Sequence, residues 1–183
     1  MQALALLLDT FFFFLIGSAL LRAWLVAVGL GLGPQPGRFV VAVTDWLVHP
    51  LRRILPKGMA LGHWDGASLL AAMLLAIAYG GFWAMVAMSG SAAYANSGVF
   101  FLLVPTLAFK MLLRTVFQGL FFMVLGFAIL SWIQPQSHTY HVLDRLLSPI
   151  LAPIRRVIPV VGGVDLAPIA LILGLQLLQS VLV

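Results

Sequence analysis

The chain has 183 residues, of which 63% are hydrophobic and 8% are charged, whereas an ordinary soluble domain has about 45–50% and about 25%. A soluble core of this size cannot bury so much apolar surface, so the composition predicts an all-α membrane protein. The net charge of +5 comes from basic residues that flank apolar stretches, which argues against direct nucleic-acid binding, and the lack of cysteine excludes disulfides and thiolate metal sites.

Four apolar stretches predict four membrane-spanning helices, because a span needs about 20 apolar residues. The third stretch, Val99–Ile133, is too long for one simple span and contains Pro105. We therefore expect the span itself near Met111–Trp132, with Val99–Phe109 as an interfacial or re-entrant lead-in. The other three spans are expected at about Ala3–Leu30, about Gly66–Ser89 and from Leu166 to the C-terminus.

Basic residues gather in the two long loops, which lie between the first and second spans and between the third and fourth. The turn at Gly90–Gly98 contains none. By the positive-inside rule both long loops face the cytoplasm, so both termini are predicted outside. The loop residues that carry this signal are Arg38, Arg52, Arg53 and Lys57, then Arg145, Arg155 and Arg156.

The two long loops share the pattern Pro, apolar, Arg, Arg, apolar, apolar, Pro. It runs from Pro50 to Pro56 in the first loop and from Pro153 to Pro159 in the second, and an aspartate precedes the next span in each case. The sequence therefore divides into a first repeat, residues 1–97, and a second, residues 98–183. Because each repeat contains two spans, the copies have the same orientation and are parallel repeats.

Each loop is predicted to form an interfacial elbow, which we define as residues 38–56 and residues 139–159. The stretches Arg38–Val48 and Thr139–Ser148 mix apolar and charged residues, as amphipathic helices in the headgroup layer do. The prolines then bracket an arginine pair. Since adjacent helical residues point about 100° apart, one arginine of each pair can face lipid while its neighbour turns toward protein.

The paired Pro-x-Arg-Arg-x-x-Pro elbows, each followed by a glycine-containing turn and an aspartate-led helix start, resemble the YggT (YlmG-like) membrane proteins of bacteria and plastids. The second copy, with Gly162, Gly163, Val164 and Asp165, is closer to the family pattern than the first, which has an insertion at Lys57–His63. This resemblance implies a bacterial inner-membrane protein linked to osmotic-stress tolerance and ion homeostasis. It also implies a link to cell division, since some members are encoded beside division genes.

Two groups of candidate site residues lie in the elbows. The first comprises Arg52, Arg53, Arg155 and Arg156, which are either a binding site for anionic lipid headgroups or a protein partner, or a plain topology signal. The second comprises Asp65 and Asp165, which are expected to cap the following helices and pair with elbow arginines. A cation site made jointly by the two aspartates is the alternative.

A third group, Asp9, Lys110 and Arg114, places charges inside or beside apolar spans. Counted back from Trp24 and Trp132, the depths of Asp9 and Arg114 differ by only three residues, or about 4.5 Å. We therefore expect an intramembrane ion pair, because such charges seldom stay unpaired. His138 and His141 have a spacing that suits a metal, but no carboxylate or thiolate joins them, so no metal or other cofactor is predicted.

The residues predict a non-enzymatic membrane factor whose elbows engage anionic lipid or a partner. No Ser-His-Asp order, glycine-rich phosphate loop or paired acid pattern stands out in the sequence. Two alternatives stay open: an oligomeric ion channel or transporter, and an assembly factor for a membrane complex or the division machinery. Partners other than lipid are a second copy of the chain or a membrane or division protein.

Overall fold

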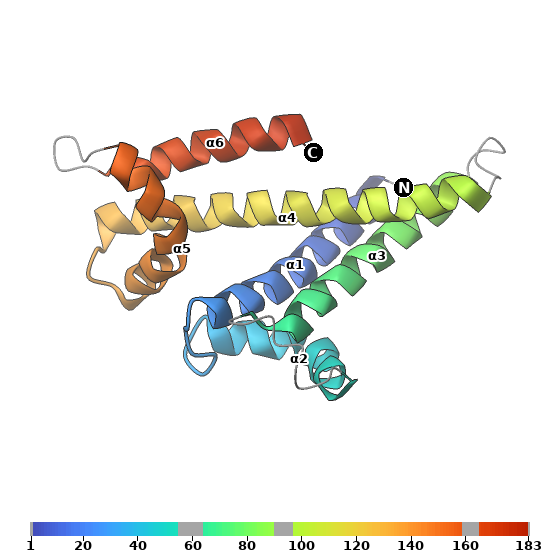
Figure 1. Ribbon diagram of the computed structural model, residues 1–183, viewed down its shortest axis with the longest axis horizontal. Coiled ribbons are helices and arrows are strands. Elements are labelled where there is room, and N and C mark those ends of the chain that lie inside the picture. Colours follow the sequence, from blue (N-terminus) through green and yellow to red (C-terminus); the bar gives the residue numbers. More distant parts are fainter. Residues whose placement is uncertain (1, 55–63, 90–96, 159–164, 183) are drawn as a thin grey trace. The chain divides into compact units, whose positions relative to one another are not determined.

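A computed structural model describes residues 2–54, 64–89, 97–158 and 165–182, and these residues form α-helices and short connections (Figure 1). The predicted all-α class is confirmed. The helices are α1 (Gln2–Ala27), α2 (Gly37–Ile54), α3 (Gly66–Ser89), α4 (Ser97–Ile133), α5 (His138–Val157) and α6 (Ala167–Leu182).

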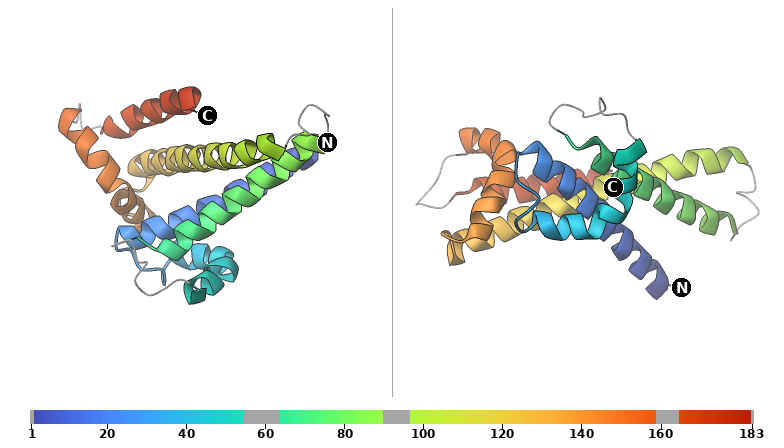
Figure 2. Two further views of the ribbon diagram at one scale, coloured as in Figure 1. Left: turned by 45° about the vertical axis from the view of Figure 1, so that its right-hand side comes forward. Right: turned by 90° about the horizontal axis from the view of Figure 1, so that it is seen from below.

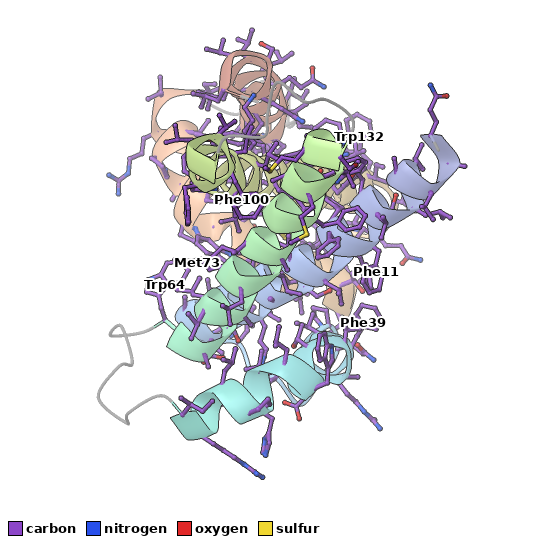
Figure 3. All side chains as sticks on the ribbon, turned by 90° about the vertical axis from the view of Figure 1, so that its right-hand side faces the viewer. Phe11, Phe39, Trp64, Met73, Phe100 and Trp132 are labelled. Atoms are coloured by element: carbon purple, nitrogen blue, oxygen red, sulfur yellow. The ribbon has the colours of Figure 1, made fainter. Side chains whose placement is uncertain are left out.

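Three of these helices, α1, α3 and α4, are long and apolar enough to cross a membrane. Their apolar side chains point outward along much of their length, as Phe11 and Met73 do in Figure 3, and a bilayer is the solvent that accepts such a surface. The helix α6 is apolar but has 16 residues, which is about 24 Å against a hydrocarbon core of about 30 Å. The fourth predicted span therefore stays a prediction.

The third apolar stretch is one continuous helix, α4, with Pro105 inside it. Of the two alternatives for Val99–Phe109, a re-entrant lead-in is therefore wrong, and an interfacial lead-in stays a prediction. A proline removes only one intrahelical hydrogen bond, and membrane helices accommodate it because neighbouring groups satisfy the freed carbonyl. Pro105 thus does not end the helix, although it suggested a boundary in the sequence.

The chain divides into two compact units, Met1–Thr115 and Val116–Val183. They do not coincide with the repeats expected at residues 1–97 and 98–183, which remain a sequence-based prediction. In the first unit α1 and α3 pack side by side, and α2 lies across one end of both (Figures 1 and 2). Its core is built around small residues of α3 together with Ile16, Ala19, Val48, Ala108 and Met111.

Helices of the first unit approach closely at Gly80 of α3. A Cβ atom built there would lie 2.5 Å from the carbonyl oxygen of Val104 in α4 and 3.1 Å from the amide nitrogen of Ala108. Small residues are what permit such backbone approach in membrane helices. Ala71, Ala76 and Ala84, which lie on the same buried side of α3, are fully buried.

The second unit has a smaller core where α5 meets the last turns of α4 and the start of α6. Val124 and Phe127 come from α4, Leu147 and Leu151 from α5, and Ala167 from α6. The ring of Tyr140 stacks on that of Phe127, with 5.1 Å between centroids. The amphipathic helix of each unit therefore has its buried side fixed against protein.

Both elbow helices extend further than the sequence indicated. The helix α2 continues through Pro50 and both arginines, and α5 continues through Pro149, Pro153 and its arginine pair. The first proline of each motif is thus inside a helix and does not bracket a separate segment. Pro56 and Pro159, the second prolines, lie outside the described residues.

Candidate functional site

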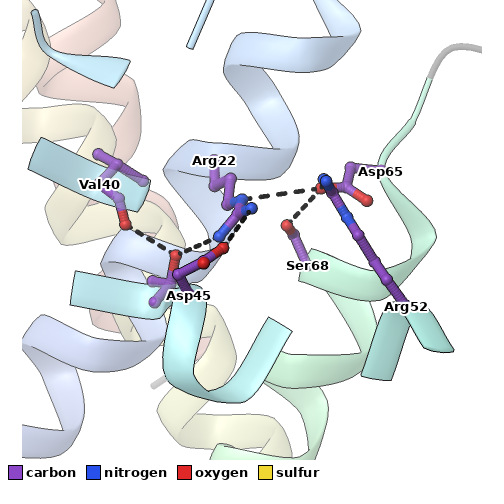
Figure 4. Close-up of polar contacts among 7 residues, drawn as sticks. Arg22, Val40, Asp45, Arg52, Asp65 and Ser68 are labelled. Atoms are coloured by element: carbon purple, nitrogen blue, oxygen red, sulfur yellow. Dashed lines mark hydrogen bonds and ion pairs between the residues drawn. The ribbon is translucent and has the colours of Figure 1, made fainter. Parts of the chain in front are cut away.

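A buried arginine holds the first elbow to the end of α1. The side chain of Arg22 is 3% exposed, and its guanidinium donates to the Thr44 hydroxyl at 3.0 Å and to an Asp45 carboxylate oxygen at 3.2 Å (Figure 4). The Thr44 hydroxyl in turn donates to the Val40 carbonyl at 2.7 Å. These bonds join α1 to α2 through a charge that could not stay buried alone.

Asp65, just before α3, accepts two hydrogen bonds and lies near a third polar side chain. Its Oδ2 accepts from Arg52 at 2.5 Å and from the Ser68 hydroxyl at 2.6 Å, and it lies 3.9 Å from Nε of Arg22. Burial disfavours the charged carboxylate, but the bonds from Ser68 and Arg52 and the charges of Arg52 and Arg22 outweigh it and hold the pKa of Asp65 below its usual 3.8. Asp65 therefore links α1, α2 and α3 as a carboxylate.

The second unit makes its connection with Arg155. Its Nε donates to Asp165 at 2.8 Å, a second nitrogen lies 3.6 Å from Asp144, and the guanidinium carbon sits 5.9 Å from the centre of the Phe127 ring. The other carboxylate oxygen of Asp165 accepts from the Ala167 amide at 3.0 Å, so this side chain also caps α6. Pro168 follows in the first turn, where its missing N–H costs no helical bond.

The structure therefore separates the two arginines of each pair. The first, Arg52 or Arg155, bonds the aspartate of the next helix. The second, Arg53 or Arg156, is exposed in the last turn of its elbow helix. Arg53 contacts Nε2 of His49 at 3.0 Å, and no ion pair joins Arg53 or Arg156 to a carboxylate within the described residues.

The group of Asp9, Lys110 and Arg114 differs from expectation. Among the described residues no ion pair within 4.0 Å joins Asp9 to either cation; Asp9 instead accepts from the Tyr79 hydroxyl at 3.1 Å. A Cβ at Gly17 would lie 3.5 Å from Thr115, so the backbone beside Arg114 is level with Gly17. Gly17 is eight residues beyond Asp9, or about 12 Å, which is a larger offset than the three residues, about 4.5 Å, expected between Asp9 and Arg114.

In the part of the chain that the structure describes, no three His, Asp or Glu side chains gather as metal ligands. Asp65 and Asp165 belong to separate units, and each is engaged by its own arginine.

Sequence reasoning missed the role of Arg22, which lies within the first apolar stretch. An arginine in an apolar helix needs a buried partner, and Thr44 and Asp45 in the adjoining loop were available signals. Their contact depends on how α2 turns its faces toward α1. Spacing along the chain does not give that information.

Comparison of the sequence with known proteins finds a matching family and several relatives. The CCB3/YggT family model matches residues 1–86 and 106–183. The protein called "Uncharacterized protein YggT" in Escherichia coli (strain K12) is 34% identical over 181 residues, which is 98% of this chain and 88% of the relative. A Vibrio alginolyticus protein described as an uncharacterized protein in the proC 3' region is 33% identical over 177 residues, 96% of this chain and 91% of that one. No solved structure matches the chain.

Proposed function

Because the chain belongs to the CCB3/YggT family, we propose that it is a non-enzymatic factor of the bacterial inner membrane whose elbows bind anionic lipid headgroups. In this proposal the chain crosses the membrane four times as two parallel repeats, with the elbows on the cytoplasmic face and both termini outside. Its cellular task is in osmotic-stress tolerance and ion homeostasis. The bacterial relatives and the long apolar helices support the location.

The observation that carries the proposal is the separation of roles within each arginine pair. Arg52 and Arg155 are occupied by Asp65 and Asp165, so a topology signal alone would not explain why a second arginine follows at once in both elbows. That second arginine is exposed at the C-terminal end of an amphipathic helix. Such a helix lies in the headgroup layer, where its outward cations meet lipid phosphates.

Protein contacts keep these exposed cations in place. Arg22 and Asp65 fix α2 to the ends of α1 and α3, and Arg155 with Asp165 ties the end of α5 to the start of α6. An arginine near an anionic surface contributes about 1 kcal/mol of attraction. The second arginine of each motif therefore adds a modest preference for anionic over zwitterionic lipid.

The test compares the two positions of each pair. In vesicles of mixed phosphatidylcholine and phosphatidylglycerol, association of spin-labelled lipids with the purified protein measures headgroup preference. We expect Arg53→Gln with Arg156→Gln to reduce the preference for phosphatidylglycerol about fivefold per site, the factor that about 1 kcal/mol gives. Arg38→Gln, which removes an exposed elbow charge outside the motif, is the matched control. An unchanged preference in the double variant would refute the proposal.

A second experiment addresses the cellular role and the rival reading as a channel. Cells lacking the protein are expected to grow poorly at high osmolarity, and the Arg53→Gln, Arg156→Gln double variant should fail to restore growth. A channel or transporter predicts ion flux in liposomes that Asp65→Asn or Asp165→Asn alters. We expect no flux, and a measured flux of that kind would replace the lipid-binding proposal.

A further inference from the structure

We propose that the N-terminal parts of α1 and α4 form a surface for a second copy of this chain, in which Asp9 of each copy pairs with Lys110 of the other. This inference concerns the end of the first unit remote from the elbow and does not rely on lipid binding there. It also assigns a partner to Lys110, which forms no ion pair within the described part of a single chain.

Asp9 and Lys110 lie at nearly the same depth. The Tyr79 hydroxyl donates to Asp9, which places this part of α3 beside Asp9. The next residue, Gly80, meets the backbone of Val104 and Ala108, and Lys110 follows two residues later. Two copies inserted in the same direction would therefore bring Asp9 and Lys110 to one level, as an axis along the membrane normal requires.

Both side chains have capacity for a partner. Lys110 is exposed and forms no ion pair within 4.0 Å with any described carboxylate. Asp9 is half-buried, and Tyr79 occupies its Oδ1. Of the five acidic residues in the chain, the four others belong to the elbows or to the start of the following helices, so Asp9 is the carboxylate that can meet Lys110 at this depth.

The position of the charges favours protein over lipid phosphate as the partner of Lys110. Tyr79 is fourteen residues beyond Asp65 along the helix, which is about 21 Å, so this level lies within a hydrocarbon core of about 30 Å that begins near Asp65. Charges at such depths usually pair with one another inside a bundle. Leu6, three residues before Asp9, is 67% exposed, and Leu102, eight residues before Lys110, is 72% exposed, so both are open to a facing helix.

The absence of cysteine from the chain makes crosslinking a clean test. One copy carries Leu6→Cys and a first tag, and the other carries Thr106→Cys and a second tag. These positions lie three and four residues from Asp9 and Lys110, on the same helix faces, and are exposed. Oxidation in membranes should give a product with both tags. Met73→Cys, exposed on α3 and six residues, or about 9 Å, nearer the elbow than Tyr79, serves as the control and should not crosslink to Thr106→Cys.

Charge exchange between copies then identifies the pair. Adding Lys110→Asp to the Thr106→Cys copy should lower crosslinking to the unchanged Leu6→Cys copy about tenfold, and adding Asp9→Lys to the Leu6→Cys copy should restore it. Because the exchanged charges are on different chains, restoration cannot come from an intramolecular pair. Asp9→Asn with Lys110→Met, which adds no repulsion, should weaken crosslinking without affecting expression.

Three results would overturn the inference. One is the absence of a product with both tags from variants that express and insert normally. Another is a product whose yield ignores both charge changes, since the pair would then contribute nothing. The third concerns the reaction of Lys110 with an amine-reactive reagent. If Lys110 is protected in anionic lipid and loses that protection only when anionic lipid is removed, its partner is a lipid phosphate.

Discussion

The two units use different residues to fasten an amphipathic helix to the spans around it. In the first, the cation belongs to a span: Arg22 of α1 reaches Thr44 and Asp45 of α2 and approaches Asp65. In the second, the cation belongs to the elbow itself, because Arg155 reaches Asp144 and Asp165. The residue that matches Arg22, counted from Trp24 and Trp132, is Leu130.

This difference sets how much of each connection is hidden from solvent. The Arg22 side chain is 3% exposed, whereas that of Arg155 is 35% exposed. Arg155 is therefore less shielded from water than Arg22, but it also lies over the Phe127 ring. The attraction between a cation and an aromatic ring is typically about 0.5–1 kcal/mol at exposed sites. The comparison teaches that the shared motif fixes the Arg–Asp pair, while the rest of each connection is particular to its unit.

The largest expected loss of stability comes from replacing Arg22, which has no counterpart in the second unit. Arg22→Met removes the hydrogen bonds to Thr44 and Asp45 and the charge beside Asp65, and should lower the free energy of unfolding by about 3 kcal/mol, since hydrogen bonds to a charged group are each worth about 1.5–3 kcal/mol. Thermal unfolding in detergent, followed by helical circular dichroism, measures this. Arg156→Met, at an exposed position, should change the midpoint little; equal losses would remove the distinction between the units.

The next effect concerns backbone approach. Gly80→Ala would place a methyl group 2.5 Å from the Val104 carbonyl oxygen and should destabilise the protein by about 1–3 kcal/mol, like other overpacking changes. In α6, a Cβ at Gly174 meets nothing within 4 Å, so Gly174→Ala should be neutral or slightly stabilising because alanine favours helix. The same unfolding measurement applies, and a stabilising Gly80→Ala would contradict the close approach.

The aspartates offer a direct exchange between units. Asp165→Asn loses the charge that pairs with half-exposed Arg155 but keeps an amide oxygen that can cap α6, so a cost of about 0.5–1 kcal/mol is expected. Asp65→Asn should cost more, because Arg52 and the buried Arg22 both lose a charge partner. Equal losses of unfolding free energy in the two variants would show that the Arg22–Asp65 interaction contributes little to stability.

The smallest effect is a pH dependence specific to the first unit. The pKa of Asp65 is lowered from 3.8 in the folded state. Between the folded pKa and 3.8, the folded protein therefore binds fewer protons than the unfolded protein. The stabilisation is complete above pH 3.8 and is lost as pH falls through the folded pKa. Unfolding measured between pH 5 and pH 3 should show a decline that Asp65→Asn reduces; an identical decline in that variant would assign the effect elsewhere.

Local pattern was enough to predict much of the fold and part of the site. Apolar length predicted α3 at its observed bounds, Gly66–Ser89, and the position of Asp165 before an apolar stretch predicted a cap. Contacts that depend on register between helices could not be predicted. The helix faces that bring Arg22 to Asp45 are set by packing. The comparison of Asp9 with Arg114, counted back from Trp24 and Trp132, assumed that α1 and α4 end at the same level, and the proximity of Gly17 to Thr115 does not support this assumption.

The run of small buried residues on α3 has a consequence for how this protein can vary. Between Ala67 and Ala84 the buried side of the helix offers neighbours little more than methyl groups, so a larger substituent there must push another backbone aside. On α6 the side chains of Leu173, Leu177 and Val181 are exposed, so replacing one apolar residue by another there should change the stability little. Random substitution should thus be tolerated least on the buried side of α3 and most on the face of α6 that carries Leu173, Leu177 and Val181.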